Sequence, residues 1–228
     1  MTNGKKSLGT VLSEALDVIT QNPIIIVPYL IPVVIALLGA VIAFGTFVPR
    51  EAVISGFELD PGFFLENALA FIGFASIFGV LAWIFGIVAA AFAITITWNA
   101  VQGRKVTLSE AWEQIGVNKI IILLIVYIIT AILTFLGFFV LCIGALIVMI
   151  LLIFVNQGII IDNLDIGATF SNSYNIAKDN FFYILILVLA FAVLGFLLGL
   201  VPIIGGILSI LVGMYATVTY TVLYLDRR

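Results

Sequence analysis

The feature that most constrains this chain is its set of apolar segments long enough to cross a lipid bilayer. Of the 228 residues, 64% are hydrophobic and only 9% are charged, and a soluble domain of this size could not cover so much apolar surface. A membrane helix needs about 20 apolar residues, so the chain has room for six. We expect an all-α integral membrane protein, a six-helix bundle in which residues 1–228 form a single polytopic membrane domain. The expected spans are Ile24–Val48, Asn67–Val101, Lys119–Leu136, Gly144–Ile161, Phe181–Leu200 and Ile207–Leu225.

Three stretches share one design, in which a short segment with one apolar face runs directly into an uninterrupted apolar run. An Asn falls at the same distance along each stretch, at Asn22, Asn118 and Asn180. We therefore expect three internal repeats, each a cytoplasmic interfacial helix followed by a transmembrane hairpin. The alternative is that the shared LSEA is a common helix opening and that Ile runs recur in any membrane protein. The stretches are Thr10–Val34, Val106–Thr130 and Asp165–Leu189, and the repeats cover about residues 7–101, 107–161 and 165–226.

The three short segments carry the start and stop signals of amphipathic helices. Thr107 and Glu110 predict a capping box at the second segment, which Gly116 can end. The third segment begins at Asp162–Asp165 and ends near Asn180. A signal peptide is the alternative for the first segment, but no small-residue cleavage site follows it. The expected apolar faces are Leu8, Val11, Leu12, Ala15, Val18 and Ile19; Leu108, Ala111, Trp112 and Ile115; and Phe170, Tyr174 and Ala177.

Proline and glycine predict where the spans bend and turn. Pro28 and Pro32 each lack an N–H group, which predicts a kink in the first span, either for packing or as a functional hinge. Asp60-Pro61-Gly62 predicts a turn before the second span. Gly137–Gly144 is expected to hold a tight turn between the third and fourth spans.

The charges predict which side of the membrane each connection faces. With six spans and the N-terminus inside, the outer segments hold one cation, Arg50. The positive-inside rule therefore favours a protein of the cell (cytoplasmic) membrane with both termini in the cytoplasm. The outer connection is acidic, with Glu51, Glu58, Asp60 and Glu66. The cations of the cytoplasmic segments are Lys5, Lys6, Arg104, Lys105, Lys119, Lys178, Arg227 and Arg228.

Two residue counts exclude common kinds of chemistry. The chain has no His and one Cys, which excludes His-based acid–base catalysis, an intrachain disulfide and a thiolate metal cluster. Cys142 is expected to be a small packing residue. The centres of the spans hold essentially no ionisable residue, which disfavours ion-coupled transport. The net charge of −3 gives no reason to expect a nucleic-acid partner, and we expect no cofactor, no metal and no catalytic residue.

Uncharged polar residues are the candidates for a site in the spans. Asn99, Asn156 and Gln157 lie at span ends, where they could line a polar cavity or simply be hydrated. Gly195 and Gly199 form a GxxxG motif in the fifth span, which could pack against the sixth span or against another subunit. The carboxylates on the polar faces of the short helices could bind a metal or serve hydrolysis, but they are typical of a solvated face.

The segment Ile160–Phe182 holds Ile161-Asp162, then Ser173-Tyr174, then Lys178 and Asn180-Phe181. In these residues it resembles a loose group of prokaryotic six-span membrane proteins. That group includes the membrane domain that precedes the catalytic domain in some bacterial glycerophosphodiester phosphodiesterases. The resemblance implies a fold and no known activity, because the catalytic domain is absent here and no His is present. Asn172 departs from the pattern, which has a basic residue there.

These observations favour a non-enzymatic role. Three surface helices on one leaflet, with no ionisable residue in the span centres, are typical of a protein that organises lipids or partner proteins at the cytoplasmic leaflet. Its expected partners are the lipid bilayer and either further copies of itself or another membrane protein. The alternative is a transporter or flippase of an uncharged or lipidic substrate, because transporters often contain repeats and kinked spans.

Overall fold

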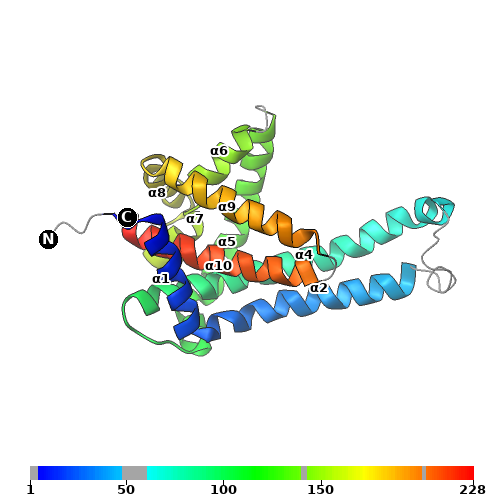
Figure 1. Ribbon diagram of the computed structural model, residues 1–228, viewed down its shortest axis with the longest axis horizontal. Helices are drawn as coiled ribbons and strands as arrows, with labels where there is room; N and C mark the ends of the chain where they lie inside the picture. Colours follow the sequence, from blue (N-terminus) through cyan, green and yellow to red (C-terminus); the bar gives the residue numbers. More distant parts are fainter. Residues whose placement is uncertain (1–4, 48–60, 140–142, 202–203) are drawn as a thin grey trace. The chain divides into compact units, whose positions relative to one another are not determined.

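The structure of the protein, a computed structural model, consists of α-helices joined by short connections (Figure 1). It describes residues 5–47, 61–139, 143–201 and 204–228, and these form no β-strand. Six helical segments are long and apolar enough to cross a membrane, so the chain is an all-α, multi-pass membrane protein, as the apolar runs predict. The helices are α1 (Leu8–Gln21), α2 (Ile26–Phe47), α4 (Pro61–Val101), α5 (Leu108–Phe138), α6 (Ile143–Leu151), α7 (Val155–Asp162), α8 (Ile166–Lys178), α9 (Phe181–Gly199) and α10 (Ile204–Arg227), with a short 3₁₀ helix, η1 (Pro23–Ile25), before α2.

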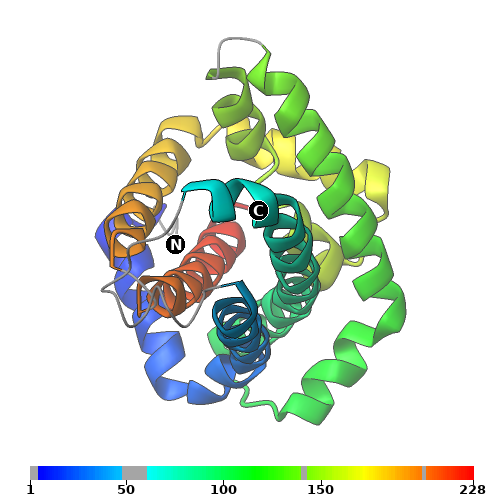
Figure 2. The same ribbon diagram turned by 90° about the vertical axis from the view of Figure 1, so that its right-hand side faces the viewer.

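The helices fall into two compact units. One is Pro28–Gly86, which holds most of α2 and the first part of α4. The other holds residues 1–27 and 87–228. Within this larger unit α5 packs against α6, α7 against α8, and both α1 and α9 against α10; Figure 2 shows α9 and α10 side by side.

The short helices α1 and α8, and the first turns of α5, begin at polar N-caps. Ser7 caps α1, Thr107 caps α5 and Asp165 caps α8, and each side chain accepts a hydrogen bond from a backbone N–H of the first turn. Thr107 and Glu110 form the predicted capping box. These contacts are local, so a sequence pattern of a few residues predicts them.

The ends of the short helices are also set by local residues. Gly116 has a φ of 65°, which breaks the helical geometry inside α5 and separates its first turns from its long apolar part, as predicted. The side-chain amides of Asn22 and Asn180 each donate to a carbonyl four residues earlier, that of Val18 at 3.0 Å and that of Ile176 at 2.8 Å. These two amides therefore bond to carbonyls in the last turns of α1 and α8, and the Val18 carbonyl also accepts from the Asn22 backbone N–H at 3.0 Å.

Of the three residues expected to form the apolar face of α8, one is buried inside the protein. Ala177 is buried, but Phe170 is only partly buried and Tyr174 is 49% exposed. The helix instead buries Thr169, Ser173 and Ile176. Hydroxyl groups lie on the buried side because α8 packs against backbone that needs hydrogen-bond partners.

The spans differ from expectation at three places. Helix α4 already begins at Pro61, so Pro61 and Gly62 of the expected turn lie in its first turn, where proline costs no hydrogen bond. The expected span Gly144–Ile161 is two helices, α6 and α7. Of the two prolines of the first span, Pro28 lies in the first turn of α2 and only Pro32 lies in its interior.

In the unit Pro28–Gly86, small residues let α2 and the first part of α4 approach closely. A Cβ added at Gly39 would lie 2.7 Å from the Phe78 ring. The rings of Phe47 and Phe71 pack edge to face, with centroids 5.6 Å apart. An apolar pocket of about 260 Å³, lined mainly by Ala and Gly, lies between these two helices.

Some predictions fall on residues outside the described part of the chain. These are the packing role of Cys142, the tight turn after Gly137 in its central residues, and the charges of the connection after the first span, Arg50, Glu51, Glu58 and Asp60.

Candidate functional site

The fourth span is interrupted, and α8 supplies hydrogen bonds at the interruption. Helix α6 ends at Leu151 and α7 begins at Val155. The Ser173 hydroxyl of α8 donates to the Leu151 carbonyl at 2.8 Å and accepts from the Phe154 N–H at 3.1 Å. Backbone polar groups within a membrane must find partners inside the protein, so this one hydroxyl satisfies a carbonyl and an N–H group across the break.

A second hydroxyl of α8 contacts the same region. Thr169 Oγ1 donates to the Val155 carbonyl at 2.8 Å. The two helices meet at Gly158, where an added Cβ would collide with this hydroxyl. Gly158 is therefore required by the close approach of α7 and α8.

Tyr224 joins the last turns of α10 to α7 and α8. Its hydroxyl donates to the Asp162 carboxylate and accepts from the Asn172 amide at 2.7 Å. Arg228 pairs with the same carboxylate, and its guanidinium lies over the Tyr224 ring, 5.8 Å from the centroid. The Tyr224 side chain is fully buried, so this cluster of four residues fixes one end of the larger unit.

The predicted site residues Asn156 and Gln157 lie on α7, near this cluster. The Asn156 amide donates to the Tyr127 hydroxyl at 2.9 Å. The Gln157 amide donates to the Thr221 hydroxyl at 3.4 Å, and its buried Oε1 has no hydrogen-bond partner among the described residues. Both amides therefore join α7 to neighbouring helices.

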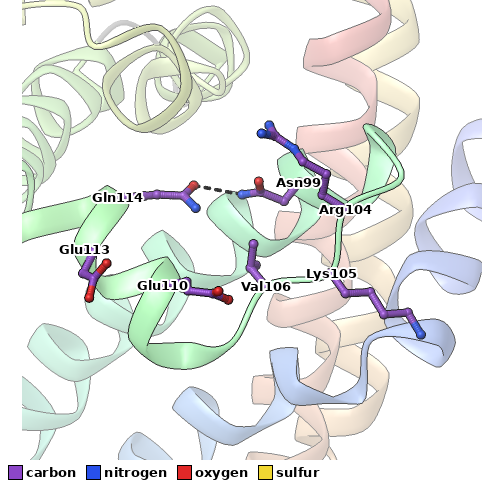
Figure 3. A pocket seen from close by; sticks show the side chains of 7 residues that line it. All are labelled: Asn99, Arg104, Lys105, Val106, Glu110, Glu113 and Gln114. Carbon is purple, nitrogen blue, oxygen red and sulfur yellow. Dashed lines mark hydrogen bonds between the residues drawn. The ribbon is translucent and has the colours of Figure 1, made fainter.

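Asn99, the third predicted residue, lies at the end of α4 and lines a pocket of about 650 Å³. Its amide donates to the Thr95 carbonyl and to Gln114 Oε1, both at 2.9 Å, and so bridges α4 and α5 (Figure 3). Asn156 and Gln157 do not line this pocket. A cavity shared by all three residues thus stays a prediction, and the structure brings only Asn99 to a pocket.

The pocket beside Asn99 carries charges of both signs. Arg104 and Lys105 come from the connection between α4 and α5, and Glu110 and Glu113 come from the first turns of α5 (Figure 3). Both carboxylates are exposed, and Glu110 is held by the capping box. The Arg104 guanidinium lies 5.9 Å from the centroid of the Trp98 ring. A ligand with a negative and a positive group could therefore be bound at its two ends.

The predicted packing motif of α9 leaves open space beside both of its glycines in the part of the chain that the structure describes. A Cβ added at Gly195 or at Gly199 would have no atom within 4 Å among the described residues. At the end of the motif the two backbones are nevertheless close, because a Cβ added at Gly205 of α10 would lie 3.5 Å from the Gly199 Cα. Packing of the motif against α10 and its contact with another subunit both stay predictions.

Sequence reasoning missed Thr169, Ser173 and Tyr224. Threonine and serine on a short helix are typical of a solvated face, and only the interrupted span explains their burial. The described residues contain no group of three or more His, Cys, Asp or Glu side chains that could hold a metal ion. The polar pocket beside Asn99 is therefore the candidate site, and it offers a ligand hydrogen-bonding and charged groups.

A scan of protein-family models, a search of curated proteins and a search of solved structures found no match to this chain. The resemblance seen in Ile160–Phe182 accordingly stays a prediction. The candidate site is interpreted from its own geometry.

Proposed function

We propose that the protein is a non-enzymatic membrane protein that binds zwitterionic phospholipid headgroups at the cytoplasmic leaflet and so organises the lipids around it. The observation that supports this is the pocket beside Asn99, where cations and carboxylates face one space at the end of a span. A headgroup phosphate would lie near Arg104, and its ammonium group near Glu113. Charge-assisted hydrogen bonds of this kind are about twice as strong as neutral ones.

The proposal includes the architecture predicted from the sequence. Three repeats would each place a short helix on the cytoplasmic side, and both termini would lie in the cytoplasm. Two observations support the repeats: the equivalent Asn22 and Asn180 make the same hydrogen bond, and N-caps open the short helices α1 and α8 and the first turns of α5. The cations at the connection between α4 and α5 support the orientation.

The test measures which lipid stays bound to the protein. The protein is incorporated into nanodiscs that contain phosphatidylethanolamine or phosphatidic acid with the same acyl chains, and retained lipid is measured by native mass spectrometry. Phosphatidylethanolamine is expected to be retained in preference, because phosphatidic acid lacks the ammonium group. Both Arg104→Gln and Glu113→Gln are expected to weaken this retention about tenfold, which is the effect of losing about 1.4 kcal/mol.

Two matched variants serve as controls. Asp17→Asn removes an exposed carboxylate of α1, and Arg228→Gln removes a cation that lines neither pocket at the span ends. Both are expected to retain phosphatidylethanolamine as the unchanged protein does. If Arg104→Gln and Glu113→Gln also leave retention unchanged, the proposed site is wrong.

The interrupted fourth span favours a second candidate, transport of an uncharged or lipidic substrate. Discontinuous helices often form the substrate sites of transporters, and the Gln157 Oε1 atom near the break has no partner among the described residues. The hydroxyls of α8 at the break favour a structural role instead. Liposomes with fluorescent lipid in both leaflets distinguish the two, because a flippase makes the inner-leaflet label accessible to an added quencher.

A further inference from the structure

A second polar pocket lies where the N-terminal segment meets the last turn of α10. Its volume is about 440 Å³, and it is lined by four cations and one carboxylate, together with the first residues of α9. The cations are Lys5, Lys6, Lys178 and Arg227, and the carboxylate is Asp179. It shares no lining residue with the pocket beside Asn99.

Arg227 is the unusual residue of this pocket. Its side chain is only 3% exposed. Its Nη2 donates to the Lys6 carbonyl at 2.9 Å, and its Nε lies 3.3 Å from an Asp226 carboxylate oxygen. Its Nη1 has no hydrogen-bond partner among the described residues. The guanidinium also lies over the Tyr183 ring, 4.9 Å from the centroid. Neither this contact nor Asp226 gives Nη1 an acceptor, and a buried donor without one is costly, so the geometry calls for an acceptor at this position.

The backbone of α9 points to the same chemistry. Asn180 is the N-cap of α9 but makes no side-chain bond to the helix. Its amide nitrogen donates to Ile176, and its oxygen accepts from Lys5 Nζ at 3.3 Å. The first N–H groups of α9 therefore have no side-chain cap, and such a helix end, with its partial positive charge, favours an anion.

The other cations are compensated to different degrees. Lys6 pairs with Glu14 at 2.7 Å. Lys178 lies over the Tyr174 ring and has no carboxylate within ion-pair distance among the described residues. The backbone of Lys6 is held by Asp226 and Arg227, so the N-terminal segment is positioned at the pocket rather than lying loosely beside it.

We propose that this pocket binds a phosphate group through Arg227, Lys178, Lys5 and the N-terminus of α9. The phosphate would belong either to the headgroup of an anionic phospholipid or to a soluble phosphate compound. Phe182, which is 77% exposed and lines the pocket, offers an apolar surface where acyl chains would leave the headgroup. The site is independent of the proposed zwitterionic pocket and does not require it.

The test uses the full chain in phosphatidylcholine nanodiscs doped with phosphatidylglycerol of the same acyl chains. Native mass spectrometry is expected to show that phosphatidylglycerol is enriched on the protein, and that Lys178→Gln and Arg227→Gln each reduce this enrichment about tenfold. Lys178→Gln alters an exposed side chain, so it keeps the test valid if Arg227→Gln folds poorly. Arg228→Gln, which removes the neighbouring cation outside the pocket, is expected to leave the enrichment unchanged.

A second arm identifies the source of the phosphate. Inorganic phosphate is titrated into the detergent-solubilised protein, and binding is followed by calorimetry. Binding that is lost in Lys178→Gln, with no enrichment of phosphatidylglycerol, supports the site and assigns it to a soluble phosphate. If neither probe binds, or if binding is the same in Lys178→Gln and Arg227→Gln, the proposal is overturned. Arg104→Gln should change neither the enrichment of phosphatidylglycerol nor the binding of inorganic phosphate. Failure of the phosphate site and failure of the proposed function are therefore separate results.

Discussion

Thr169 of α8 donates a hydrogen bond of 2.8 Å to the carbonyl of Val155, which is the first residue of α7. This bond joins a short helix to the first turn of α7, directly after the interruption of the fourth span. The Thr169 side chain is fully buried, so water cannot replace the bond. It lies beside the bonds of Ser173 to the Leu151 carbonyl and the Phe154 N–H, which satisfy the backbone at the interruption.

Thr169→Val is expected to destabilise the protein by about 1 kcal/mol. The substitution keeps the shape of the side chain but removes the buried hydrogen bond between α8 and the Val155 carbonyl. The measurement is the unfolding transition of the detergent-solubilised protein in increasing dodecyl sulfate. Thr20→Val is the control, because the Thr20 hydroxyl lies on an exposed part of α1 and bonds only within its own helix. Equal effects of the two substitutions would contradict the role of Thr169.

Gly158→Ala is expected to destabilise the protein, although alanine is the better helix former by about 1 kcal/mol. The added Cβ would collide with the Thr169 hydroxyl, so α7 and α8 would have to separate. Gly213→Ala in α10 is the matched control, because no described atom lies within 4 Å of its added Cβ. The thermal unfolding temperature should fall for Gly158→Ala and hold or rise for Gly213→Ala; a rise in both would show that the close approach is not required.

Tyr224→Phe is expected to cost about 1–2 kcal/mol of stability. The change removes the hydroxyl that donates to Asp162 and accepts from Asn172. The Asn172 amide then loses this acceptor, while Asp162 keeps only its pair with Arg228. Tyr174→Phe is the control, because Tyr174 is 49% exposed and its ring remains available to Lys178. The measurement is the free energy of unfolding of both variants. A loss in Tyr174→Phe as large as that in Tyr224→Phe would refute the stabilising role of the Tyr224 hydroxyl.

The proposed orientation predicts the behaviour of a reporter that is active only in the cytoplasm. Fused after Arg228 the reporter should be active, and inserted near Glu58 it should be inactive, because the cations gather on one side of the spans. The abundance of each fusion, measured with an antibody, provides the control. The reverse pattern of activity would overturn the orientation.

Much of the fold could be predicted because its signals are local. The apolar runs predict six spans, and the structure has six helical segments able to cross a membrane. Thr107 with Glu110, and Gly116, predict the start and end of a short helix from contacts within one or two turns. Asn99 could be singled out as a polar residue at a span end, and it does line a pocket.

The polar sites could be predicted only in part. The sequence of α8 predicts an apolar face of Phe170, Tyr174 and Ala177, but it does not predict that Thr169 and Ser173 are buried. The phosphate pocket joins Lys5, Lys178 and Arg227, which lie far apart in the sequence. The hydrophobic periodicity of a single segment cannot predict that these three side chains line one pocket.

The sequence by itself determined that this chain is a membrane protein, how many spans it has and where its short helices begin. These features depend on hydrophobicity and capping, which are set by neighbouring residues. The tertiary structure alone decided that the fourth span is interrupted and that the hydroxyls of Thr169 and Ser173 are buried against it. The physical reason is that a backbone group freed inside a membrane needs a partner. That partner comes from whichever helix packs beside it.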